Sequence, residues 1–195
     1  MQGSNTREIG RAAIRRELAL TSMALFVAGG FDRVTFDDLA AAAGVSRSTF
    51  LRYFASKEDV VLFVFDPLGE SMIGALASRP PEEGEWPALR RAVDPAVALV
   101  AATPTESLAL LRLIWDTPAL VGRLHDKQAS WRPGLVEVLM ARQGGRDSPV
   151  LAVQTRVMAA LGCLLIAFDA WVGGAGEQDL RRLVDFTFEA LGSID

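Results

Sequence analysis

The chain has 195 residues, of which 50% are hydrophobic and 23% are charged, and its formal net charge is −4. This is the length of one large domain or two small ones, and the apolar content supplies a packed core, which excludes a largely disordered chain. A single cysteine, Cys163, excludes an internal disulfide. With a single histidine, His125, it also leaves too few ligands for an ordinary zinc site and makes triad catalysis unpromising. We therefore expect an intracellular globular protein with no metal and no cofactor.

The N-terminal segment is polar and basic over its first seventeen residues, which argues against a secretory signal. The most apolar run, 157–168, has about twelve residues, whereas a membrane span needs roughly 20. We therefore expect no membrane contact and a cytoplasmic location.

Charge is distributed unevenly along the chain. Residues 1–65 carry eight cations against seven acids, while residues 66–195 carry twelve against seventeen. Between Leu39 and Lys57 there are three cations and no acid. Such a local patch, more than the net charge, allows a domain to approach phosphates.

The first part of the chain reads as short helices with clear start and stop signals. Gly29 and Gly30 end the first helix. Thr35 with Asp38 three residues later forms a capping-box pattern at the start of the second helix. Gly44 ends that helix, and Ser46 caps the third. The expected helices cover 7–29, 35–43, 47–53 and, after Ser56, about 20 residues to Ser78.

The rest of the chain is also predicted to be helical, after a Pro- and Gly-rich loop at 79–87. Prolines stand at or near three of the expected starts, and Pro133 should kink or break the helix that contains it. No alternating β-branched run appears, so the predicted fold is all-α. The expected helices are 87–102, 105–116, 118–142, 149–173 and 177–192.

The two short helices around Gly44, Val45 and Ser46 are typical of a helix-turn-helix. Gly44 permits a left-handed turn, Val45 packs beneath both helices, and Ser46 caps a recognition helix whose exposed side chains are rich in hydrogen-bond donors. The alternative is an ordinary helical corner with a solvated basic face. The residues expected to contact DNA are Thr35, Ser46, Arg47, Ser48, Thr49, Arg52, Tyr53 and Lys57.

Four segments, 30–40, 43–46, 49–54 and 56–59, together resemble the tetracycline-repressor (TetR) family. The likeness runs from about Leu18 to Val61 without gaps. It implies a helix-turn-helix domain in residues 1–55 and a helical domain for ligand binding and dimerisation in residues 56–195. The sequence departs from the family at Leu51, where a phosphate-contacting Tyr is usual, which shifts weight to Tyr53 and Lys57.

The C-terminal region resembles the family only in patches, including 117–120 and 169–171. These patches are similar to a subgroup associated with acyl-CoA-like ligands, which implies a small hydrophobic effector, with acyl-CoA as the first candidate. The alternative is a filled core with no cavity, in which the tryptophans only pack. The candidate ligand-binding residues are Arg112, Trp115, Arg123, Trp131, Phe168 and Trp171.

The resulting hypothesis is a ligand-responsive transcriptional regulator, most often a repressor by resemblance, that binds a palindromic operator in duplex DNA as a homodimer. An all-α enzyme and a helical adaptor without DNA binding remain as alternatives. The last two helices are expected to form the dimer. Some of their apolar residues must face the core and others the partner: Leu161, Leu164, Leu165, Phe168, Leu183, Phe186 and Leu191.

Overall fold

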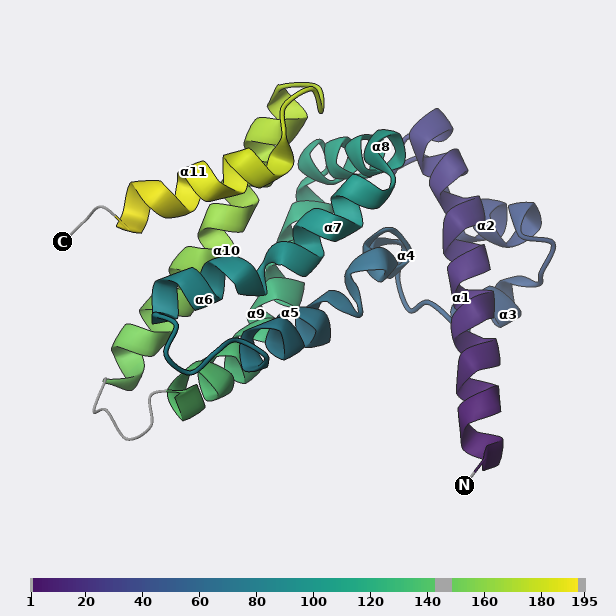
Figure 1. Cartoon of the computed structure of the whole chain (residues 1–195). Coiled ribbons are helices and arrows are strands. Elements are labelled where there is room, and N and C mark those ends of the chain that lie inside the picture. The colour runs from purple at the N-terminus through teal and green to yellow at the C-terminus, as the bar shows by residue number, and fades with distance from the viewer. Residues whose placement is uncertain (1, 143–148, 193–195) are drawn as a thin grey trace. The chain divides into compact units, whose positions relative to one another are not determined.

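The computed structural model describes residues 2–142 and 149–192, with side chains from residue 9 onward. Within these ranges the regular structure is entirely helical (Figure 1), which confirms the predicted fold class. The helices are α1 (Gln2–Gly29), α2 (Phe36–Ala42), α3 (Arg47–Leu51), α4 (Lys57–Val61), the 3₁₀ turn η1 (Leu62–Phe65), α5 (Leu68–Ala77), α6 (Glu85–Ala92), α7 (Asp94–Ala102), α8 (Pro104–Trp115), α9 (Pro118–Arg142), α10 (Val150–Gly173) and α11 (Leu180–Gly192).

The chain folds into two compact units. The first runs to Asp66 and also includes residues 113–123, and the second contains residues 67–112 and the chain from Leu124 onward. The backbone therefore passes from one unit to the other after Asp66, near the end of α8 and near the start of α9. The expected domain boundary after residue 55 stays a prediction.

The single long helix expected from Ser56 to Ser78 was wrong. The structure divides this stretch into α4, η1 and α5, with Pro67 at the N-cap of α5. Proline lacks a backbone N–H, so residue 67 cannot donate the hydrogen bond that a continuous helix would need at this point.

Two other prolines affect the predicted helices in opposite ways. The helix expected over 87–102 is split into α6 and α7, with Pro95 in the first turn of α7. By contrast, α9 continues through Pro133 without a break. Next to that proline, Gly134 leaves room for Ile73 of α5, because a Cβ at residue 134 would collide with the Ile73 side chain.

The core of the first unit is built from phenylalanines. Phe26, Phe50 and Phe54 are almost completely buried, and the rings of Phe50 and Phe54 lie 5.7 Å apart. Phe54 also meets Phe63 edge to face, with centroids 5.8 Å apart. These contacts attach the end of α3 to η1, so the short recognition helix takes its position from the core rather than from its own length.

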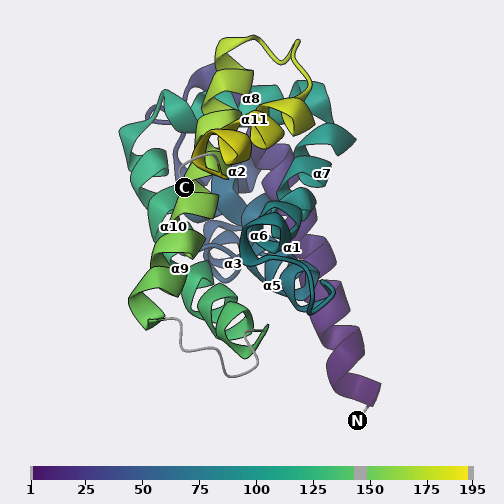
Figure 2. The ribbon, with the colours of Figure 1, turned by 60° about the vertical axis from the view of Figure 1, so that its left-hand side comes forward.

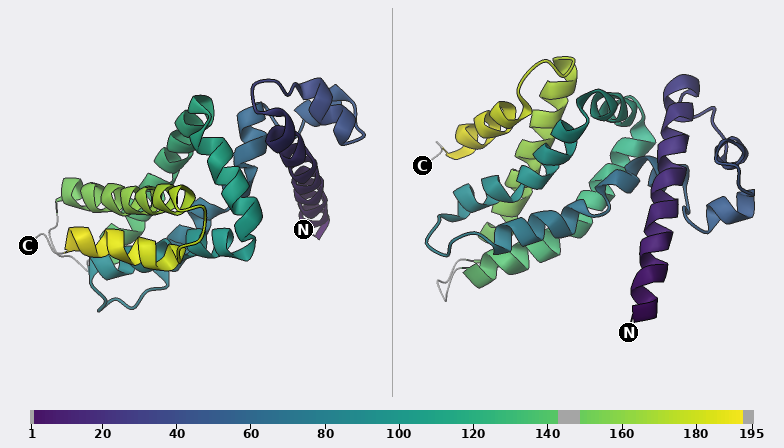
Figure 3. Two further views of the ribbon diagram at one scale, coloured as in Figure 1. Left: turned by 90° about the horizontal axis from the view of Figure 1, so that it is seen from above. Right: turned by 45° about the vertical axis from the view of Figure 1, so that its right-hand side comes forward.

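In the second unit, α5, α6 and α7 pack against one another, and α6 also contacts α10 and α11 (Figure 2). The last two helices, α10 and α11, lie side by side, as Figure 3 shows from two directions. The inner face of α10 includes Val157, Leu161, Leu164 and Phe168, all buried. This pair therefore forms one side of the helical bundle.

From the sequence, no stretch is expected to be long enough to cross a membrane. This was wrong, because two stretches meet the length and composition of a membrane span. Residues 57–77 and 150–173 both reach the length and hydropathy of a span, with mean hydropathy 1.6 and 1.9. The first stretch is broken before Pro67, and the second buries one face in the bundle. The exposed side of α10 also carries large apolar side chains, and these need a separate explanation.

Candidate nucleic-acid interface

The turn between α2 and α3 has the geometry predicted for a helix-turn-helix. Gly44 adopts φ +66°, a left-handed conformation that favours glycine. The Ser46 hydroxyl accepts a hydrogen bond from the Thr49 backbone N–H at 3.2 Å and so caps α3. It also donates to the Thr49 hydroxyl at 3.0 Å and lies 3.0 Å from the Ser48 hydroxyl. Three hydroxyls therefore gather at the start of α3.

A complete capping box begins α2. The Thr35 hydroxyl accepts from the Asp38 N–H, while the Thr35 hydroxyl and backbone N–H donate to the Asp38 carboxylate at 2.7 and 2.9 Å. These two hydrogen bonds hold the pKa of the Asp38 carboxyl below its usual value. Both donors of Thr35 are thus engaged by Asp38, and the predicted phosphate contact of Thr35 would compete with this carboxylate.

The basic side chains of α3 are displayed to solvent. Arg47 and Arg52 are exposed, and Arg47 makes one loose ion pair with Asp37, at 3.6 Å between two well-exposed groups. Such a pair stabilises little and is easily exchanged for another anion. Tyr53 is half-buried, and Leu51 is exposed at the position where the family usually has Tyr.

Lys57 is positioned differently from a simple phosphate-binding lysine. Its ammonium donates to the backbone carbonyls of Phe31 and Val34 at 2.9 and 2.8 Å, and it lies 4.7 Å from the centroid of the Phe31 ring. An ammonium has three donors, so one remains for a phosphate. The structure therefore gives Lys57 a second role, which is to hold the loop between α1 and α2 against α4.

Arg15 is half-buried between aromatic side chains of this unit and is not displayed on its basic surface. Its guanidinium lies between the rings of Phe54 and Phe63, 5.0 and 4.9 Å from their centroids, and pairs with Asp66 at 2.8 Å. In the sequence, Arg15 stands near three other arginines, Arg7, Arg11 and Arg16. The phenylalanines on either side of it could not be recognised, because they come from residues about 40 and 50 positions later.

Comparisons with known proteins agree with this geometry. Residues 20–64 match the family described as bacterial regulatory proteins, tetR family, and residues 83–194, more than half of the chain, match the MftR C-terminal domain. The chain belongs to the TetR family. It is a DNA-binding transcriptional regulator with an MftR-type C-terminal domain, and this family is not enzymatic.

Named relatives extend the likeness over most of the chain. MftR of Mycobacterium tuberculosis, named for mycofactocin biosynthesis, is 28% identical over 183 residues, 94% of this chain and 91% of that protein. The regulator TcmR of Streptomyces glaucescens is 29% identical over 148 residues, 73% of this chain and 65% of TcmR. FadR of Thermus thermophilus, solved with lauroyl-CoA, has the same fold, with TM-score 0.57, 21% identity and coverage of 91% and 92%.

The six predicted ligand residues are divided between the two units. Trp131, Phe168 and Trp171 are buried in the second unit, where Trp131 packs against the bare backbone of Gly69. Arg112 is exposed on α8. Two of the six, Trp115 and Arg123, fall in the first unit.

Arg123 already has an anionic partner. Its Nη2 and Nε lie 3.0 and 3.3 Å from Oδ1 of Asp59 in α4. The pair attaches the start of α9 to α4, the helix that follows the helix-turn-helix. A groove of about 350 Å³ between α6 and α11 contains none of the predicted residues; its lining is Trp86, Pro87, Arg90, Asp185, Phe188, Glu189 and Gly192.

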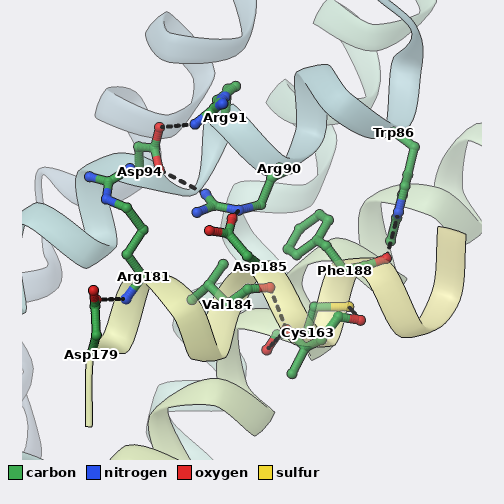
Figure 4. A network of polar contacts seen from close by, with 11 residues as sticks. Trp86, Arg90, Arg91, Asp94, Cys163, Asp179, Arg181, Val184, Asp185 and Phe188 are labelled. Atoms are coloured by element: carbon green, nitrogen blue, oxygen red, sulfur yellow. Dashed lines mark hydrogen bonds and ion pairs between the residues drawn. The ribbon is translucent and has the colours of Figure 1, made fainter.

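Polar contacts fix α11 to the bundle (Figure 4). Arg90 of α6, which is buried, donates to Asp185 at 2.6 Å and to Asp94 at 2.7 Å. The Trp86 indole N–H donates to the Phe188 carbonyl at 3.0 Å. Cys163, on the neighbouring α10, is buried and donates to the Thr187 carbonyl; burial raises the pKa of its thiol, as in an inert cysteine.

These contacts occupy the inner face of α11 and leave large apolar side chains exposed on its outer face. Leu161, Leu164 and Phe168 face the core, whereas Phe186 and Leu191 are exposed, and Leu165 and Leu183 are half-buried. The structure thus identifies which of these residues face the core, and the assignment of the exposed ones to a partner stays a prediction. Three residues that the sequence reasoning missed extend the face along α10 at spacings of seven and eight: Leu151, Met158 and Ile166.

Proposed function

We propose that this TetR-family protein is a cytoplasmic repressor that binds a palindromic operator as a homodimer and is released by a small hydrophobic effector. The observation that carries the DNA-binding part is the capped helix α3, which presents Arg47, Ser48 and Arg52 to solvent from a window with no acid. Donors of this kind at the start of a helix can read base edges in the major groove.

The proposed DNA-contact set combines α3 with its flanks. Arg47 and Ser48 are suited to base edges, and Arg52 and Tyr53 to the sugar–phosphate strand. Lys57 adds one N–H to a phosphate while its other two hold the loop before α2. The complete proposed set is Thr35, Ser46, Arg47, Ser48, Thr49, Arg52, Tyr53 and Lys57.

The homodimer is supported by the outer face of α10 and α11. Exposed large apolar side chains recur along both helices, and the inner contacts of α11 do not need them. Large apolar side chains that are exposed together on one part of a folded domain mark a site of association. A two-fold dimer also matches the symmetry of a palindromic operator.

The effector is proposed to be acyl-CoA-like, on the patchy sequence resemblance and the shared fold with a FadR solved with lauroyl-CoA. Release requires that the ligand prefer the protein conformation that does not fit the operator. Because α8 and α9 each begin in one unit and end in the other, an effector that shifts either helix in the second unit also acts on the first. The Arg123–Asp59 pair then carries that shift to α4.

Replacing Arg47 with alanine is expected to lower the affinity for operator by about 1–3 kcal/mol and to relax specificity, because a bidentate contact to a base is lost. The measurement is a mobility-shift titration with the intergenic DNA upstream of the gene and with single-base variants of the site. Arg16→Ala, on α1, removes the same charge and serves as the control. Equal affinity and specificity in R47A and wild type would contradict the assignment of α3.

Long-chain acyl-CoA thioesters are expected to dissociate a preformed protein–operator complex and to raise the melting temperature of the free protein. A ligand at 100 times its Kd stabilises the native state by about 2.7 kcal/mol. The titration uses chains of increasing length, with free CoA as the control. If no acyl-CoA has either effect, this effector class is wrong, and if a broad panel of hydrophobic compounds also fails, effector control is wrong.

A further inference from the structure

Arg11, which lies before the residues that match the family, is next to the end of the recognition helix. Its Nη2 donates to the backbone carbonyl of Arg52 at 3.4 Å, and Arg52 is the C-cap of α3. One turn further along α1, Arg15 packs on Phe54. Going back along α1 from Arg15 to Arg11, the contact partner changes from Phe54 to Arg52. This part of α1 therefore lies beside the end of the recognition helix.

The positive charge of Arg11 can bind an added anion, whereas that of Arg15 is already paired. Arg15 is half-buried and paired with Asp66, whereas Arg11 is exposed and, among the residues that the structure describes, pairs with no carboxylate. A guanidinium has five N–H donors, and the Arg52 carbonyl uses one of them. The remaining donors and the full positive charge can bind a second acceptor.

The position of Arg11 indicates what that acceptor is. The first residues of a recognition helix contact base edges, so the other end of the helix lies toward the side of the groove. The major groove is about 12 Å wide, which a helix with its side chains fills. A cation at the C-terminal end of α3 therefore meets the sugar–phosphate strand that borders the groove.

We propose that Arg11 binds a phosphate of the operator backbone, so that the DNA-binding surface extends along α1 beyond the helix-turn-helix. The contact is independent of sequence and adds affinity, while α3 supplies specificity. The inference rests on the proposed operator binding by α3. The competing role is structural: Arg11 could serve only to satisfy the carbonyl at the end of α3.

The salt dependence of binding separates the two roles. Each phosphate contact contributes about 0.9 to the slope of log K against log salt concentration, so removing one from each subunit of the dimer lowers the slope by about 1.8. Arg11→Gln keeps an N–H donor for the Arg52 carbonyl and loses the charge. Between 50 and 200 mM salt, its affinity is expected to fall about twelvefold less than that of wild type.

The experiment measures operator affinity of the full chain at several salt concentrations, with thermal unfolding as a parallel readout. Arg11→Lys should keep the wild-type slope because it keeps the charge. Arg16→Gln, an exposed arginine on another side of α1, should also keep it. A wild-type slope in R11Q overturns the inference, whether or not its stability changes. If wild type itself shows no preference for any fragment, the proposed function fails first, which is a different result.

Discussion

Replacing Ile166 and Phe186 together with glutamate is expected to convert the proposed dimer into a monomer. Their side chains are 63% and 70% exposed in the single chain, so the substitutions should leave the fold of each subunit intact. Burying a side chain of this size contributes about 1.5–3 kcal/mol, and each residue occurs twice in a two-fold interface. Four unpaired carboxylates at that interface add a desolvation cost. Light scattering at micromolar concentration measures the oligomeric state.

The same double variant should bind a two-half-site operator about 10²–10⁴ times more weakly, because the second recognition helix is no longer held near its half-site. Affinity for a single half-site should stay unchanged. Leu20→Glu, at an apolar residue of α1 that is 58% exposed, is the matched control and should remain dimeric. A dimeric I166E/F186E protein would show that subunits associate through another surface.

The α10–α11 pair also shows the limit of hydrophobic patterning. A helix that is apolar on one side can be oriented from its sequence, but α10 is apolar almost all round. Leu164 and Ile166 are both large and aliphatic, yet one is buried and the other exposed. The positions of neighbouring helices, including α11 and α6, decide which face is inside, and these depend on contacts between residues such as Arg90 and Asp185 that are far apart in the sequence.

The helix-turn-helix was predictable because the residues that signal it act on positions close to them in the sequence. Thr35 and Ser46 cap helices through residues three positions later, and Gly44 is needed for a turn at its own position. The break at Pro67 also had a local signal, which the apolar pattern around it outweighed in the prediction. The Arg11–Arg52 contact had no such signal, since 41 residues separate its partners.

Replacing Lys57 with methionine is expected to destabilise the first unit by about 2–4 kcal/mol. The reason is that the charged ammonium no longer donates its two hydrogen bonds to backbone carbonyls. Methionine keeps the length of the side chain, so the change isolates the ammonium. The Phe31 and Val34 carbonyls would lose their donor, and the loop that positions Thr35 and α2 would lose its attachment to α4. Thermal unfolding should show a lower Tm, by about 2–4 °C for each kcal/mol.

DNA binding by K57M should weaken for all sequences, since α3 packs on α2 and α2 follows the released loop. The salt slope then separates the two contributions of this lysine. A slope lower by about 0.9 for each half-site indicates the phosphate contact, and an unchanged slope with a lower Tm indicates that the ammonium serves only the loop. Lys127→Met, a half-buried lysine on α9, is the control for the same chemical change. A K57M protein with the Tm of wild type would mean that the two carbonyls do not depend on the ammonium, and the role of Lys57 in holding the loop would be wrong.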